Sequence, residues 1–251
     1  WISDQLLAGF TIMRAFVLDG VECDKFEYGK YQASVSGGKL QSVPGVLPAA
    51  NRSLTQFIAD AQARNVGGVE GFRAHHYDMW TAVQWLYLVE MATMDSQTAT
   101  GEGRVNASSA AAVDAADVAQ ATYRGIVGLW GNVYQWMDGV RTLNSVIQRR
   151  DYNGAWESTG EAVPAAGGAQ YPITFRATGD EQFIANTYSS SNDSTATLPD
   201  YRRWRDAGEY YPIVGGYWSD GASAGHWYVS CNYSASYVRS SFGSRLARVV
   251  S

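Results

Sequence analysis

Three stretches decide the fold of this chain: GGYWSDG at residues 215–221, HWYVSCNY at residues 226–233 and GSRLAR at residues 243–248. In the second stretch two sets of side chains alternate strictly: Trp227, Val229 and Cys231 on one parity, and His226, Tyr228, Ser230 and Asn232 on the other. A period of two residues is typical of a strand with one buried face. We therefore expect the first set to face the core and the second to face solvent.

The side chains expected to face outward are of the kind that binding surfaces use. Tyr gives a large contact area at low entropic cost, and Ser and Asn adapt their hydrogen bonds to different partners. The pattern therefore predicts a face made for binding.

The same region lacks five residue types. From Ile213 to Ser251 there is no Lys, Glu, Gln, Met or Thr, although all five occur earlier in the chain. Asn codons (AAC) that vary at their two adenines reach Tyr, Ser, Asp, His, Arg and Asn but never Lys, Glu, Gln, Met or Trp, so Trp218 and Trp227 would be fixed. In this respect the segment resembles the variable region of proteins diversified by diversity-generating retroelements, whose C-terminal part has a C-type lectin-like fold. The alternative is an ordinary strand region rich in Ser and Tyr.

Further motifs extend the resemblance over most of the chain. CDKFE at residues 23–27, GNVYQW at 131–136, and GGYW at 215–218 with GSR at 243–245 resemble, in order, motifs of the formylglycine-generating-enzyme family. This chain departs from the family signature GNVWEW at Tyr134 and Gln135. The resemblance implies an α+β fold of the C-type lectin-like class, formylglycine-generating-enzyme subtype, with two helices around short antiparallel strands and long loops.

Local patterns predict where the elements lie. Apolar residues at 54, 57, 58 and 61, with Ser53 placed to cap them, predict a short amphipathic helix. A second, largely buried helix is expected from a cap at Asp78 to Thr93. The opening stretch predicts a hairpin with its turn at Asp19 and Gly20. Residues 101–121 are either a helix or a covering insertion, and residues 151–194 are expected to form long loops with short strands.

Length and charge narrow the function classes. The chain has 251 residues and a formal net charge of -5, with no basic stripe, so nucleic acid is not an expected partner. No apolar run approaches the length of a membrane span, so no direct membrane insertion is expected. Residues 1–4 carry neither an initiator Met nor a signal-peptide pattern. We expect residues 1–251 to be one domain, with the variable ligand-binding region at about residues 213–248, and to be the C-terminal part of a longer protein.

Enzymatic chemistry is not expected. Formylglycine-generating enzymes hold copper with two nearby C-terminal cysteines, because thiolates select Cu(I), whereas this chain has only Cys231 in that region. Cys23 lies near the other end and can pair with Cys231 only if the fold brings them together. His75, His76 and His226 are too few and too scattered to predict a metal site.

The carboxylates give no stronger signal. Asp138, Asp151, Glu157 and Glu161 are at spacings that specify no catalytic pair, and we expect them in loops and turns. Nucleophile elbows, phosphate-binding loops and zinc-protease motifs are absent from the sequence. We expect no cofactor; calcium, which lectin-like folds often carry, stays open because no run of oxygen ligands forms a dedicated loop.

The resemblance implies that the binding residues are the diversified, solvent-facing ones. They are Tyr217, Ser219, Asp220, Ser223, His226, Tyr228, Ser230, Asn232, Tyr233, Ser236, Tyr237, Arg239 and Ser240. The four tyrosines among them would be anchors, and Arg239 should matter more than the serines, because Tyr and Arg are frequent interface hot spots. Some tyrosines would alternatively only cover the edge of the core. The constant inner face would comprise Trp218, Trp227, Val229, Cys231, Phe242 and Leu246.

These observations predict a ligand-binding display protein with no catalytic activity. The expected target is a cell-surface protein or glycan, and the expected location is a phage tail in the virion or a bacterial cell surface. A homo-oligomer, such as a trimer, would multiply weak contacts. The rivals are a formylglycine-generating-type oxidase or an inactive relative, and a fixed structural virion domain. Residues 198–205, with three arginines, are either a solvated loop or part of the rim of the same surface.

Overall fold

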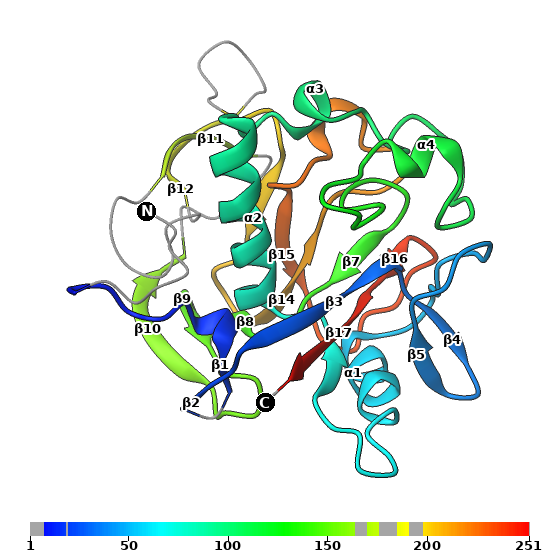
Figure 1. Ribbon diagram of the computed structural model, residues 1–251. Helices are drawn as coiled ribbons and strands as arrows, with labels where there is room; N and C mark the ends of the chain where they lie inside the picture. Colours follow the sequence, from blue (N-terminus) through cyan, green and yellow to red (C-terminus); the bar gives the residue numbers. More distant parts are fainter. Residues whose placement is uncertain (1–7, 19, 164–169, 176–184, 191–197, 251) are drawn as a thin grey trace.

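The computed structural model describes residues 8–18, 20–163, 170–175, 185–190 and 198–250. It is a mixed α+β structure with few helices and many short strands (Figure 1). The helical elements are η1 (Arg14–Phe16), α1 (Leu54–Gln62), α2 (Tyr77–Met91), α3 (Ser96–Ala99), α4 (Ala116–Ala119) and η2 (Gly221–Ser223).

The central sheet brings together strands from the second half of the chain. Its main path runs β10-β9-β8-β14-β15-β13, and β7 joins β14 to β16. The bounds are β7 (Tyr134–Trp136), β8 (Val140–Leu143), β9 (Val146–Arg149), β10 (Glu157–Ala162), β13 (Arg202–Trp204), β14 (Glu209–Val214), β15 (Val229–Tyr233) and β16 (Phe242–Gly243). All pairings are antiparallel except those of β13 with β15 and of β16 with β7.

A smaller sheet joins the two ends of the chain. The C-terminal strand β17 (Arg245–Val250) lies between β3 (Lys25–Gln32) and β6 (Phe72–Ala74). Figure 1 shows β3 and β17 side by side. Three two-stranded sheets complete the list: β1 (Val17–Leu18) with β2 (Val21–Glu22), β4 (Ser34–Ser36) with β5 (Lys39–Gln41), and β11 (Tyr171–Phe175) with β12 (Ala185–Ser189).

The predicted opening hairpin exists but is short. It comprises only β1 and β2, because β3 pairs with the distant β17 instead. Asp19, expected in its turn, lies outside the described residues. Residues 101–121 form a covering segment whose single helix is the four-residue α4. The region from 151 to 194 holds the short strands β10, β11 and β12, and parts of it lie outside the described residues.

Helix α1 begins as predicted. The Ser53 hydroxyl accepts from the Gln56 main-chain N–H at 3.2 Å, and the Gln56 side chain accepts from the Ser53 N–H at 2.9 Å. This reciprocal capping box satisfies two N–H groups that a helix end leaves free. Its buried face, Leu54, Phe57 and Ala61, packs beneath the central sheet.

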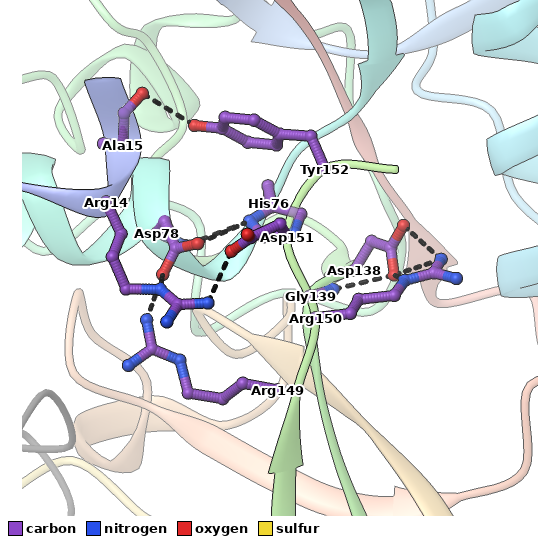
Figure 2. Close-up of polar contacts among 10 residues, drawn as sticks. All are labelled: Arg14, Ala15, His76, Asp78, Asp138, Gly139, Arg149, Arg150, Asp151 and Tyr152. Carbon is purple, nitrogen blue, oxygen red and sulfur yellow. Dashed lines mark hydrogen bonds and ion pairs between the residues drawn. The ribbon is translucent and has the colours of Figure 1, made fainter. Parts of the chain in front are cut away.

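The start of α2 differs from the prediction. The N-cap is His76, whose ring Nδ1 accepts from the Asp78 N–H at 3.3 Å, and Asp78 lies in the first turn. Figure 2 shows the surroundings of the Asp78 carboxylate: Arg149 donates to it, and His76 and Arg14 lie beside it. An acidic group there also complements the positive end of the helix dipole. The helix is largely buried, as expected, and lies across the central sheet (Figure 1).

The two cysteines do not pair. Both are buried free thiols, Cys23 in one hydrophobic cluster and Cys231 in another. The Cys231 thiol donates to the Tyr210 carbonyl at 3.2 Å, and burial raises its pKa to about 12. None of the helices in the described part of the chain combines the length and the apolar character that crossing a membrane requires.

One fully buried guanidinium ties the two larger sheets together. Arg245 donates from Nε to Gln135 Oε1 at 2.9 Å, from Nη1 to the carbonyls of Gly29 and Lys30, and from Nη2 to those of Val127 and Gly128. Burial lowers its pKa to about 10, against the opposing influence of Tyr28, so it stays charged at neutral pH. These five acceptors come from β3, β7 and the loop before β7.

Gln135, at the position where the family signature has Glu, fits this network by donating as well as accepting. Its Nε2 donates to the carbonyls of Gly128 at 3.2 Å and Leu129 at 3.1 Å. A carboxylate would place negative oxygen against these two carbonyls. The neutral amide therefore satisfies the loop and the guanidinium together.

Arg245→Lys should cost about 2 to 5 kcal/mol of unfolding free energy, because an ammonium has three donors for five acceptors and leaves buried carbonyls without partners. The measurement is urea unfolding. Arg248→Lys on the same strand is the matched control: its ion pair with Glu27 lies at the surface, with the two side chains 28% and 49% exposed, so the expected loss is under about 1 kcal/mol. Equal losses in the two variants would contradict the role of Arg245.

Candidate binding face

The predicted alternation is confirmed for the side of the sheet at Tyr228, Val229 and Cys231, but it is wrong for the side on which His226 lies and wrong for exposure. Val229 and Cys231 pack toward α2, and Tyr228, just before the strand, packs on the opposite side with Trp136 and Ile213. β15 pairs on both edges, with β13 and with β14, and hydrophobic clusters pack on both of its faces.

Three predicted site residues are therefore not solvent-facing. His226, Tyr228 and Ser230 are 0%, 5% and 3% exposed. For Tyr228 and Ser230 the prediction was wrong because a second layer, which includes α1 and a group of aromatic rings, covers the side that the alternation assigned to solvent. For His226 it was wrong because the ring packs on the other side of the sheet, against α2. Of the expected inner face, Trp227, Val229, Cys231, Phe242 and Leu246 are buried, whereas Trp218 is partly exposed.

His226 belongs to the core on the α2 side. Its ring lies 4.5 Å from that of Trp80 and 5.4 Å from that of Tyr87. Burial lowers its pKa to about 3, so the ring is neutral at physiological pH. Its main chain is held by Ser96 Oγ, which accepts from the His226 N–H, and by Gln84, which donates to the His226 carbonyl. Its role in this position is packing.

The other ten predicted residues reach the surface. Ser219, Ser236, Tyr237, Arg239 and Ser240 are exposed, and Tyr217, Asp220, Ser223, Asn232 and Tyr233 are partly exposed. They come from the connection between β14 and β15, from the end of β15, and from the connection between β15 and β16. Their role in binding stays a prediction.

A continuous tyrosine cluster joins the two connections. We define it as Tyr134, Tyr201, Tyr217, Tyr228, Tyr233, Tyr237 and Phe242. Tyr217 stacks on Tyr134 at 4.6 Å and Tyr201 on Tyr228 at 5.4 Å, and Tyr233 lies 4.7 Å from Tyr237 and 4.9 Å from Phe242. Rings at these separations attract one another beyond simple area burial. The cluster grades from buried Tyr228 to Tyr237, which is 40% exposed.

A half-buried carboxylate lies under the cluster. Asp220 Oδ1 accepts from the Tyr134 hydroxyl at 3.1 Å, and Oδ2 accepts from the Tyr217 N–H at 3.2 Å. Burial raises the pKa of Asp220 to about 6, although both hydrogen bonds and the charge of Arg239 oppose the shift. The face therefore carries a group that titrates close to neutral pH.

The connection from 215 to 225 is anchored through its main chain. The Trp218 carbonyl accepts from the Ala107 N–H at 2.6 Å, and the Gly221 N–H donates to the Val105 carbonyl at 3.0 Å. Gln97 Nε2 donates to the carbonyls of Gly221 and Ala224, at 2.9 and 2.7 Å. The partners belong to α3 and to the covering segment 101–121, both outside the region that lacks five residue types.

The connection from 234 to 241 is held in the same way. The Arg239 carbonyl accepts from the Asn51 N–H at 3.0 Å, and the Ser241 carbonyl accepts from the Tyr134 N–H at 2.9 Å. These anchoring bonds do not depend on which side chain stands at 239 or 240. The exposed positions of both connections can therefore vary without loss of these bonds.

Sequence reasoning missed several neighbours of this face. Tyr134 and Tyr201 complete the tyrosine cluster. In the sequence, Tyr134 stood out only because it departs from the signature GNVWEW. Tyr201 lies in segment 198–205, which the sequence left open as a solvated loop or part of the rim. Of the arginines in that segment, Arg202 is buried and Arg205 is exposed. The role of Gln97 could not be predicted from the sequence, because its side chain bonds main-chain atoms that are distant along the chain.

The described residues contain no group of three or more His, Cys, Asp or Glu side chains arranged to hold a metal ion. The candidate binding face presents aromatic rings, hydroxyls, one carboxylate and one guanidinium. Such groups bind through contact area and hydrogen bonds.

Comparison with models of protein families and with curated protein sequences finds no match. Among solved structures, the chain is similar to Treponema denticola variable protein 1, with a TM-score of 0.43 and 15% sequence identity. The match covers 86% of this chain and 74% of that one. A likeness this remote does not by itself assign a family, a ligand or an activity.

Tyr228→Ala should destabilise the protein by about 3 to 5 kcal/mol, because it opens a cavity between Tyr134 and Tyr201. Tyr237→Ala, at the exposed end of the same cluster, should cost about 1 kcal/mol. Chemical denaturation of both variants measures the difference. A stable Tyr228→Ala variant would mean that this ring lies on the surface after all.

The raised pKa of Asp220 predicts a pH effect. The folded state holds this proton up to about pH 6, whereas the unfolded chain releases it near pH 4, so the contribution of Asp220 to stability falls as pH rises between these values and is flat above them. Relative to the wild type, Asp220→Asn should therefore gain about 2 kcal/mol between pH 4 and pH 7. Urea unfolding across this range measures the difference; a pH-independent difference would show that the carboxyl is not perturbed.

Proposed function

We propose that this chain is a ligand-binding display protein with a C-type lectin-like fold, whose exposed side chains on the tyrosine cluster and its two flanking connections are diversified by a retroelement. The observation that carries the proposal is that the main chain of this face is anchored by bonds that do not involve its exposed side chains. Main-chain hydrogen bonds and residues outside the variable region hold its shape, and the exposed side chains at 219, 236, 237, 239 and 240 make none of these bonds.

The composition of the region agrees with this arrangement. The exposed and partly exposed positions of the predicted set carry only Tyr, Ser, Asp, Asn and Arg, all of which variation of Asn codons at their adenines produces. The proposed contact residues are Tyr217, Ser219, Asp220, Ser223, Asn232, Tyr233, Ser236, Tyr237, Arg239 and Ser240. His226, Tyr228 and Ser230 become framework residues, because the packed interior tolerates little change.

The proposed ligand is a protein or glycan on a cell surface. Tyr217, Tyr233 and Tyr237 offer aromatic area, and Arg239 offers a planar donor, the two side-chain types that most often dominate binding energy. We place the protein on a phage tail or a bacterial surface, and we propose a homo-oligomer, such as a trimer, that raises avidity.

The rival oxidase reading requires a copper-holding thiol pair. Cys231 is fully buried, and the chain's only other cysteine, Cys23, lies in a separate cluster. This supports a protein without that activity. A fixed structural virion domain remains the second rival. Such a domain gives no reason for the absence of Lys, Glu, Gln, Met and Thr from residues 213–251.

The test is sequencing of the DNA around the gene. The proposal predicts a near-identical repeat of the segment coding for residues 215–248, beside a reverse transcriptase gene, with differences only at adenines. The differing codons should be those of the ten proposed contact residues and should spare the codons of His226, Trp227 and Val229. The absence of any repeat, or differences spread over buried and exposed positions alike, would leave an ordinary fixed interface.

A further inference from the structure

A guanidinium group from outside the variable region lies beside the tyrosine cluster. Strand β13 runs parallel to β15, with Arg203 beside Ser230 and Trp204 beside Cys231. Trp204 and Cys231 are buried in the hydrophobic cluster that packs against α2. Because neighbouring residues of a strand point to opposite faces, Arg203 points to the other side of the sheet, which is the side of the tyrosine cluster. Its side chain is partly exposed there.

The guanidinium of Arg203 lies near the hydroxyl group of Tyr201. Burial raises the pKa of Tyr201, and both the charge of Arg203 and a hydrogen bond with it oppose this rise. The Tyr201 ring stacks on that of Tyr228 at 5.4 Å, and Tyr233 influences the pKa of both, after larger effects that include burial. Arg203 is therefore a neighbour of the proposed binding face.

No carboxylate in the described part of the chain forms an ion pair with Arg203. The two carboxylates nearest to it in the sequence are engaged elsewhere. Asp200 is buried, and its Oδ2 accepts from the Trp227 N–H at 2.7 Å. Asp206 is exposed, and its Oδ1 accepts from the Ala207 N–H at 2.9 Å. The positive charge of Arg203 is therefore not compensated by a neighbouring carboxylate.

Asp220, the carboxylate under the cluster, lies at the opposite end. It accepts from the Tyr134 hydroxyl at 3.1 Å, and the Tyr228 ring lies between those of Tyr134 and Tyr201, at 5.5 and 5.4 Å. Burial raises the pKa of Asp220, and the charge of Arg239 opposes this rise. A carboxylate and a guanidinium thus offset each other at this end, whereas the β13 end has a guanidinium alone.

We propose that Arg203 is a fixed contact residue of the binding face, and that it binds an acidic side chain of a protein ligand. This inference rests on the display function proposed above and deepens it. A guanidinium matches a carboxylate with two parallel hydrogen bonds. A protein fits the rest of the face, because Tyr, Ser and Asn are the residues of antibody paratopes, and Tyr237 and Val238, 40% and 48% exposed, offer apolar contact.

The position of Arg203 outside the variable region has a consequence for specificity. The diversified residues would change the ligand from one variant to the next, whereas Arg203 would impose the same requirement for an acidic group on every ligand. Segment 198–205 would then be part of the rim of the binding face.

The test is selection from a random dodecapeptide library on the purified chain. The recovered peptides should be enriched in Asp and Glu over the unselected library, although the formal net charge of -5 repels acidic peptides in general. Binding of a recovered acidic peptide should weaken as salt is added. Recovery of no peptides, or of peptides without acidic enrichment, would overturn the proposal.

Arg203→Gln should weaken binding of a recovered acidic peptide about tenfold, since hydrogen bonds to a charged group are lost. Arg203→Lys keeps the charge without the planar fork and should restore part of the affinity. Arg205→Gln is the matched control: it removes the same charge, but Arg205 stacks at 5.1 Å on Tyr210, which packs on the α2 side of the sheet. Thermal unfolding checks that all three variants are folded.

Equal losses in Arg203→Gln and Arg205→Gln would show that general charge attracts the peptide, and would contradict a contact at Arg203. Titration with N-acetylneuraminate tests a glycan as the source of the acidic group: binding of this sugar that Arg203→Gln abolishes, without acidic enrichment among the peptides, would overturn the protein ligand. A coding repeat that differs at adenines, found together with unchanged binding by Arg203→Gln, would leave the display function standing and would overturn only the role of Arg203.

Discussion

The buried guanidinium of Arg245 is the interaction on which the other features depend. It holds β3, β7, β17 and the loop before β7 together through five hydrogen bonds. That loop continues into Gly131, whose N–H bonds the Gly215 carbonyl, and into Tyr134 at the centre of the tyrosine cluster. A charge removed from water is tolerated only when every donor is matched, so this network allows few arrangements of the strands beneath the proposed binding face.

The main-chain anchoring of the two connections follows from the same architecture. α3 and the covering segment 101–121 hold the connection from 215 to 225, and the segment near Asn51 holds the connection from 234 to 241. The anchoring bonds are therefore supplied by residues outside the face, and the side chains of Ser219, Ser236, Tyr237, Arg239 and Ser240 take no part in them. This is the property that a protein needs if its contact residues are to change while its fold does not.

Much of the local structure could be predicted from sequence, and the failures were non-local. The cap at Ser53 depends on neighbouring residues and was predicted correctly, as was the inner side of β15. The burial of Tyr228 and Ser230 depends on β13, α1 and Tyr201, which no period within β15 reveals. The N-cap is His76 and not Asp78, whose carboxylate is engaged by the distant Arg149. The choice of Gln135 likewise follows only from its contact with Arg245.

The central claim is that the scaffold does not depend on the exposed side chains of the face. The most direct measurement is the unfolding free energy of one variant in which Ser219, Ser236, Tyr237, Arg239 and Ser240 are all replaced by Ala. The account predicts a folded protein within about 2 kcal/mol of the wild type, since exposed substitutions cost little and distant ones add. A loss above about 5 kcal/mol, the scale of core disruption, would contradict it and would mean that these side chains hold the fold.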